Sequence, residues 1–161
     1  MDTMRDKLAD SEPPVTTADL DRFEQAHGLV IPAAYRAFLL KHNGGSPSPE
    51  NFRVEMEPRS HTRRSQTRLF GTAVEFFLSL DADDVSIWAV WPYVTEGRLQ
   101  VGLFPIAYCG GDLLCLSTRE DTRDQVFYWF SDEEYAARAE GDRNLYFVAL
   151  TFEEFLERLH D

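Results

Sequence analysis

Apolar residues near the start of the chain recur with helical spacing. A first helix is predicted over residues 17–27, because Thr16 and Asp19 have the spacing of a capping box and Gly28 offers a left-handed stop. Its apolar stripe consists of Leu20, Phe23 and His27.

Two further helices follow from the same spacing. Pro32 is suited to the first position of a helix over residues 32–42, since its missing N–H costs nothing there, and Asn43-Gly44-Gly45 ends that helix. Thr151 and Glu154 form a second capping-box pattern, which predicts a terminal helix over 152–160. The stripes are Tyr35, Phe38, Leu39 and His42, then Phe152, Phe155, Leu156 and Leu159. His27 and His42 are interpreted as partly buried structural histidines rather than metal ligands.

Between these helices the pattern is that of strands. Residues 52–56 alternate apolar and charged side chains, and apolar runs cover 104–109, 113–117 and 126–130. Gly110-Gly111 is expected to turn a hairpin, and both faces of the 113–117 strand are apolar, as in a central strand. Residues 87–94 favour a short helical face, weakened by Pro92, and 144–150 a short strand or an extended lead-in.

The order of these elements predicts an α+β fold, an antiparallel sheet flanked by N-terminal helices and a C-terminal helix, in a single domain. The length of 161 residues fits one domain, with 1–14 expected as a flexible tail and 15–161 as the folded part. The longest uncharged run, 99–111, is too short to span a bilayer, and the charged N-terminus does not resemble a signal peptide. A cytoplasmic location is therefore expected.

Charge narrows the choice of partners. The chain has 16 basic and 28 acidic residues, a formal charge of −12, which disfavours binding to nucleic acid or anionic membranes. It favours a basic protein partner, although solubility alone also explains it. One segment departs from this balance: Arg59 to Arg68 carries four arginines and one histidine with no acid, and is expected to be a polar loop.

Cys109 and Cys115 do not have the spacing of a zinc site. A two-residue turn would place Cys109 opposite Asp112 and Cys115 opposite Ile106, on the other face of the sheet. The sequence therefore predicts two buried, reduced thiols.

A search for catalytic patterns finds no phosphate-binding loop, nucleophile elbow or zinc-protease motif. Residues 81–84 faintly resemble a calcium loop, but Val85, Ser86 and Pro92 occupy positions that need a ligand or glycine. The pairs Glu133-Glu134 and Glu153-Glu154 lie in polar segments and are interpreted as solvated. No catalytic residue, cofactor site or metal site is predicted, and the protein is not expected to be an enzyme.

Several short motifs, in their order, resemble the SUKH superfamily (Smi/Knr-like), which includes fungal regulators of cell-wall synthesis and bacterial immunity proteins. The resemblance covers roughly residues 16–160, apart from 59–68 and 79–96. The motifs are Leu29-Val30-Ile31-Pro32-x-x-Tyr35-x-x-Phe38-Leu39-x-x-x-Asn43-Gly44-Gly45, Pro105-Ile106-Ala107, Cys109-Gly110-Gly111-Asp112, Val126-Phe127-Tyr128-Trp129 and Phe152-x-x-Phe155-Leu156. Their residues favour helix ends, turns and core packing, so we interpret them as a structural signature.

The resemblance implies a non-enzymatic binding scaffold with a similar α+β fold. Bacterial members typically neutralise toxins, often nucleases, so the leading hypothesis is an immunity protein that occludes a cognate, basic toxin domain. The alternative is an intracellular regulatory module without a toxin partner, and an unrecognised enzyme is a third. The candidate partner-binding residues are Asp81, Asp83, Asp84, Glu120, Asp121, Asp124, Asp132, Glu133 and Glu134. These would imitate a polyanion, unless they are ordinary solvated charges. The sequence does not identify the toxin, the contact surface or the oligomeric state.

Overall fold

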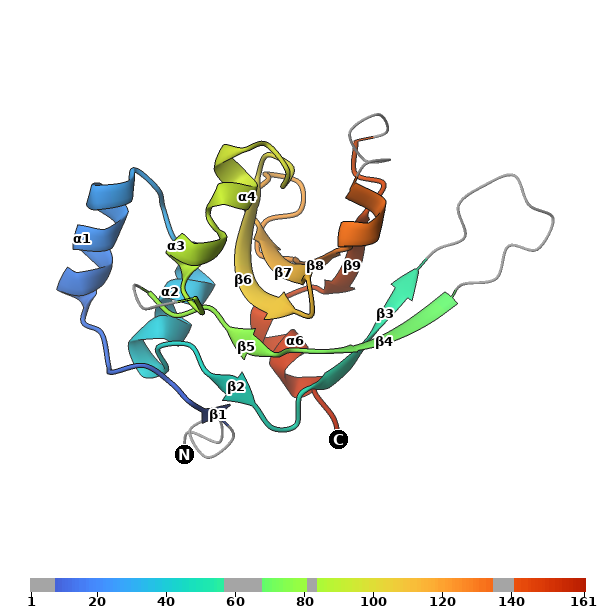
Figure 1. Cartoon of the computed structure of the whole chain (residues 1–161), viewed down its shortest axis with the longest axis horizontal. Helices are drawn as coiled ribbons and strands as arrows, with labels where there is room; N and C mark the ends of the chain where they lie inside the picture. The colour runs from blue at the N-terminus through green and yellow to red at the C-terminus, as the bar shows by residue number, and fades with distance from the viewer. Residues whose placement is uncertain (1–7, 57–67, 81–83, 135–140) are drawn as a thin grey trace.

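The computed structural model describes residues 8–56, 68–80, 84–134 and 141–161 (Figure 1). At its centre is a five-stranded antiparallel sheet in the order β5-β6-β7-β8-β9. The elements are β1 (Leu8–Ala9), α1 (Thr17–His27), α2 (Ala33–Lys41), β2 (Ser46–Pro47), β3 (Asn51–Met56), β4 (Arg68–Ala73), β5 (Phe76–Phe77), α3 (Ile87–Val90), α4 (Pro92–Thr95), β6 (Leu103–Cys109), β7 (Asp112–Ser117), β8 (Val126–Trp129), η2 (Ser131–Glu133), β9 (Leu145–Ala149) and α6 (Phe152–Glu157). The α+β fold, with helices at both ends of the chain and an antiparallel sheet, is therefore confirmed.

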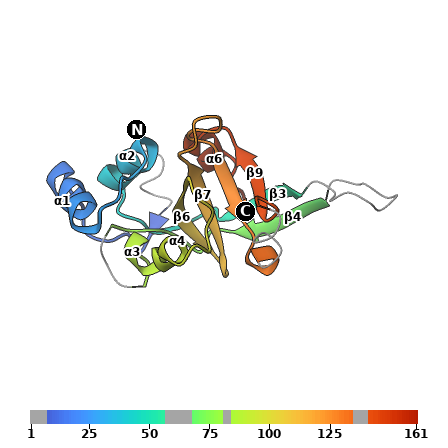
Figure 2. The same cartoon turned by 90° about the horizontal axis from the view of Figure 1, so that it is seen from above.

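Two neighbouring residues of β8 show how the layers are arranged. Successive side chains of a strand point to opposite faces, and Tyr128 meets Phe52 of β3 while Trp129 meets Tyr93 of α4. Phe52 also packs edge-to-face against Phe155, with ring centroids 5.1 Å apart, which brings α6 to the Tyr128 side. Figure 2 shows α4 and α6 on opposite sides of β6 and β7. As predicted, the central strand β7 is buried along its whole length.

Helix ends agree with the sequence where a side chain caps them. The capping box of Thr16 and Asp19 is present, and Gly28 adopts the left-handed conformation with φ 63°. The second helix begins one residue later than predicted, because Pro32 is the N-cap rather than the first helical residue. The terminal helix ends at Glu157 instead of residue 160, since the main chain of His160 pairs with Asn51 of β3.

The sheet contains one irregularity that the sequence did not predict. The register shifts between Pro105 and Ala107, so that Cys115 pairs with Pro105 and not with Ile106 as expected. The turn itself is as predicted, with Cys109 opposite Asp112, and both cysteines are free and buried. Beside this irregularity the carbonyl of Ile106 accepts two hydrogen bonds, from the amide of Leu78 at 2.8 Å and from the Tyr35 hydroxyl at 3.0 Å.

Residues before the first helix and after β3 add strands that were not predicted. β1 pairs with β2, and the amide N–H of Glu12 donates to the carbonyl of Asn43, so residues 8–13 of the expected tail lie against the fold. Residues 59–67 of the arginine-rich segment lie outside the described residues, whereas the main chain of Arg68, expected in the loop, begins β4. β4 pairs along β3 as an arm that extends from the body (Figure 1).

The signature residues lie where the chain makes close contacts. The Tyr35 hydroxyl donates to the carbonyls of Leu78 and Ile106, which fixes α2 to the sheet. The Asn43 side chain donates to the carbonyl of Pro13 and accepts from the amide of Leu80, at 2.9 and 2.8 Å. Gly44 has φ 73°, and a Cβ there would lie 2.8 Å from the carbonyl oxygen of Phe77, so only glycine fits.

Among the described residues, no helix is long and apolar enough to cross a membrane.

Candidate partner-binding surface

Four segments meet at one edge of the molecule, which we call the acidic edge. They are residues 96–100 after α4, 118–124 between β7 and β8, 131–134 after β8 and 141–144 before β9. These segments contain eight carboxylates and four arginines. They are far apart in the sequence, and side chains of the first two segments join them together.

One junction of the acidic edge is an arginine–carboxylate pair with two parallel hydrogen bonds. Arg98 donates from Nε and Nη2 to the two carboxylate oxygens of Glu134, at 2.7 and 3.0 Å. The Arg98 guanidinium also lies 4.2 Å from the ring centroid of Tyr93, which packs on Trp129. The hydrogen bonds that Arg98 donates to Glu134 raise the pKa of Arg98. Glu134 is therefore held by the body of the protein.

A second junction ties the 118–124 segment to the start of β9. Arg119 donates to both carboxylate oxygens of Asp142, at 2.7 and 3.0 Å, and from Nε to the carbonyl of Val101 at 3.1 Å. The Gln100 amide donates to the Asn144 side-chain oxygen at 2.6 Å. These contacts hold the connections of the edge in place, so its exposed charges have a defined position.

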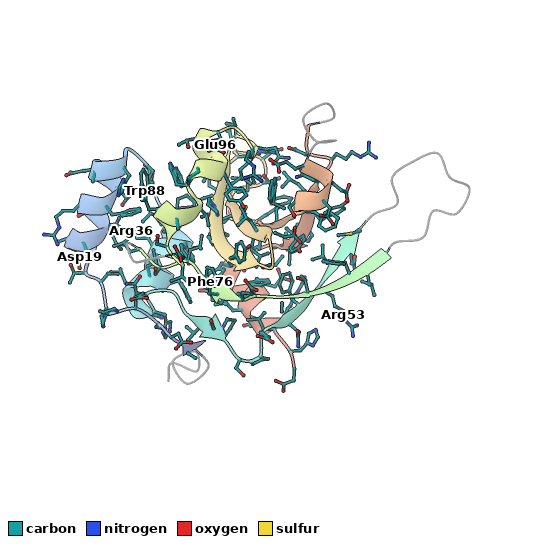
Figure 3. All side chains as sticks on the ribbon, viewed as in Figure 1. Asp19, Arg36, Arg53, Phe76, Trp88 and Glu96 are labelled. Atoms are coloured by element: carbon teal, nitrogen blue, oxygen red, sulfur yellow. The ribbon has the colours of Figure 1, made fainter. Side chains whose placement is uncertain are left out.

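Five carboxylates of the acidic edge that take no part in these two junctions are exposed. They are Glu96, Glu120, Asp121, Asp124 and Asp132. Asp124 has φ 68°, a left-handed conformation that aspartate tolerates in turns. Figure 3 labels Glu96, at the end of α4 on this side of the molecule. The edge thus presents negative charge on a framework fixed by arginines.

Two of the three predicted acidic groups lie in segments that belong to these junctions. Residues 120, 121 and 124 and residues 132–134 both belong to the acidic edge, although they lie at opposite ends of β8. Within the second group only Asp132 is exposed, because Glu133 accepts a 2.6 Å hydrogen bond from the Tyr146 hydroxyl and Glu134 binds Arg98. Asp81 and Asp83 lie outside the described residues, and Asp84 is exposed before α3, apart from the edge.

Two residues of the edge, Glu96 and Asp142, were missed by sequence reasoning. Each lies in a short connection whose neighbours in space come from distant parts of the chain. The sequence carries one weak signal, an arginine one or two residues from a loop acid, but it does not show which segments the arginines of this region join. The predicted histidines have packing contacts: His27 stacks on Trp88 with ring centroids 3.8 Å apart, and His42 is buried beside Phe38.

Asp112, from the Gly-Gly-Asp motif, is a buried carboxylate with a structural role. It accepts hydrogen bonds from the Tyr128 hydroxyl and from the main-chain and side-chain donors of Ser131, the latter two at 2.8 and 2.7 Å. Burial and this hydrogen bond raise the pKa of Tyr128. Asp112 thereby fixes the end of β8 and the start of η2. In the described part of the chain, no group of three or more His, Cys, Asp or Glu residues has a geometry suited to a metal ion.

Comparison with known proteins gives one match. A family model described as the SMI1 / KNR4 family (SUKH-1) matches residues 14–158. Neither the search of curated proteins nor the search of solved structures found a match.

Proposed function

The chain belongs to the SMI1/KNR4 (SUKH-1) family, and from this premise we propose that it is a non-enzymatic immunity protein that neutralises a cognate toxin domain by covering it. The proposal places the protein in the cytoplasm, where such a toxin would act. Family membership is the observation that supports the immunity function, since bacterial members of the superfamily typically bind toxins. The signature residues support a scaffold, because Tyr35, Asn43 and Asp112 are occupied by internal hydrogen bonds.

We further propose that the acidic edge contacts the toxin and that the toxin is basic, as a nuclease is. Besides Asp142, which binds Arg119, five exposed carboxylates at this edge lie on connections fixed by Arg98 and Arg119. Preorganised charge on one partner attracts opposite charge on the other and raises the association rate. A fixed array of carboxylates is also chemically similar to the phosphates that a nuclease binds, so it would occupy the same basic site.

The test uses a toxic nuclease domain encoded beside the gene for this protein. The purified protein is expected to inhibit DNA or RNA cleavage at a one-to-one ratio, and co-expression is expected to restore growth. If the nuclease is neither bound nor inhibited, the immunity function is wrong. Binding to a non-toxic cellular protein without protection would instead support the regulatory alternative.

A charge variant tests the surface separately. Neutralising Glu120, Asp121 and Asp124 to Gln and Asn is expected to lower the association rate constant about threefold to tenfold at low salt, with a smaller effect at high salt. The matched control also removes three charges, at Glu153, Glu157 and Asp161, which are exposed outside the edge. Inhibition that is equally strong in the edge variant and insensitive to salt would show that the toxin binds elsewhere.

A further inference from the structure

A groove of about 540 Å³ lies between β3 and β9, with α6 and the last residues of the chain along it. We call it the β3–β9 groove. Its volume falls in the range of about 300–1,000 Å³ that is typical of ligand-binding clefts in proteins. The buried rings of Phe52 and Phe155 form its floor, and side chains from both strands form its walls. None of its lining residues belongs to the acidic edge.

Both strands that border the groove have a main-chain edge that no other strand covers. Among the described residues, β9 pairs only with β8, and β3 pairs with β4 and by a single bridge from Asn51 to His160. At the free edge of β9 the carbonyl of Val148 already accepts a 2.5 Å hydrogen bond from Arg158, so the side chain of Arg158 covers this one acceptor. Unpaired strand edges bind extended peptides through main-chain hydrogen bonds.

The walls of the groove expose apolar surface. Leu69 on β4 and Phe147 on β9 are 58% and 46% exposed, which is unusual for large apolar side chains at the rim of one groove. Across the arm from Arg53 lies Gly71, and a side chain there would meet nothing within 4 Å. The outer face of the arm is therefore open, and it supplies apolar contact beside a cation.

The charge of the groove is opposite to that of the molecule. Its lining contains two arginines and one histidine but a single acid, Glu55, whereas the whole chain carries −12. Arg158 forms an ion pair with Glu154, with a nitrogen-to-oxygen distance of 2.6 Å. Arg53 is exposed and has no ion-pair partner among the described residues, and Figure 3 shows it on β3 at the base of the arm. A carboxylate is the complement of a guanidinium in such a place.

We propose that the β3–β9 groove is a docking site for an extended segment of another protein that carries both carboxylate and apolar side chains. The main chain of that segment pairs with a strand edge, its apolar side chains contact Leu69 and Phe147, and a carboxylate binds Arg53. A segment of this chemistry carries negative charge, so it differs from the basic toxin surface that is proposed to bind the acidic edge. The groove therefore provides a second contact of different character, which does not depend on the immunity function.

The test measures binding of two labelled nonapeptides with the same order of charged and apolar positions, one composed of glutamate and leucine and one of lysine and leucine. At about 0.15 M salt the screening length is about 8 Å, so the distant negative charge of the body has little effect on the acidic peptide. We expect the acidic peptide to bind in fluorescence anisotropy and to slow amide exchange in residues 51–55 and 145–149. Arg53→Glu and Phe147→Ala are each expected to weaken binding at least tenfold, and Arg53→Gln less than Arg53→Glu.

The controls are Arg123→Glu and Val101→Ala, two exposed positions outside the groove, and neither is expected to change the affinity. The proposal is overturned if the acidic peptide does not bind at millimolar concentration, if the basic peptide binds as well, or if the controls weaken binding equally. It is also overturned if light scattering shows a dimer that Arg53→Glu dissociates, since a second copy would then occupy the groove. Because no toxin enters these measurements, their outcome is independent of the immunity function.

Discussion

Replacing Phe155 with alanine tests whether the terminal helix is part of the core. Phe155 is fully buried, and its ring lies 5.1 Å from Phe52, 6.4 Å from Phe152 and 6.5 Å from Phe77, measured between centroids. Removing it leaves a ring-sized cavity bordered by three aromatic side chains. A Phe→Ala change of this kind lowers the free energy of unfolding by about 3–5 kcal/mol.

That loss is a large fraction of the stability of an ordinary domain, about 5–15 kcal/mol. For a chain of this size, 1 kcal/mol corresponds to about 2–4 °C, so the melting temperature should fall by roughly 6–20 °C. Urea unfolding is the assay, with an unchanged slope and a lower midpoint expected. Phe147→Ala is the matched control, since Phe147 is 46% exposed and its loss should change stability by less than about 1 kcal/mol. A loss below about 1 kcal/mol in Phe155→Ala would show that α6 is not docked.

Two further predictions concern buried polar groups. Tyr35→Phe removes the proton shared by the carbonyls of Leu78 and Ile106, and should lower the free energy of unfolding by about 1–3 kcal/mol in urea, whereas Tyr108→Phe, at a half-buried position, should have a smaller effect. Burial raises the pKa of both Cys109 and Cys115, so both thiols stay protonated at mildly alkaline pH. They should react with Ellman's reagent only after unfolding, and fast reaction in the native protein would contradict the structure.

The sequence predicts elements best where the signal is local. The capping box at Thr16 and the left-handed Gly28 define α1 at both ends, because the groups involved lie within a few residues of each other. The terminal helix also has a local start at Thr151, but its end depends on a contact between His160 and Asn51 that spans most of the chain. A pattern of apolar residues does not contain that information.

The same limit applies to the arm and to the acidic edge. β3 is predicted from alternation, whereas β4 begins at the last residue of the arginine-rich segment and has too few apolar residues to stand out. Two acidic groups were selected because they lie in connections, and the structure places these two connections before and after β8. Their proximity depends on Arg98 and Arg119, whose partners are 36 and 23 residues away in the sequence. Such ion pairs depend on how the sheet packs in three dimensions, so the spacing of residues along the sequence does not predict them.

The strand at the start of the chain matters to anyone who shortens or tags this protein. The family match begins at residue 14, but β1 and the contact between Glu12 and Asn43 lie before that boundary. A version cut at residue 14 would lose β1, and it would deprive the buried Asn43 side chain of the Pro13 carbonyl that accepts its proton. Fusion partners are therefore better attached upstream of residue 8 through a flexible linker, or at the exposed C-terminal Asp161.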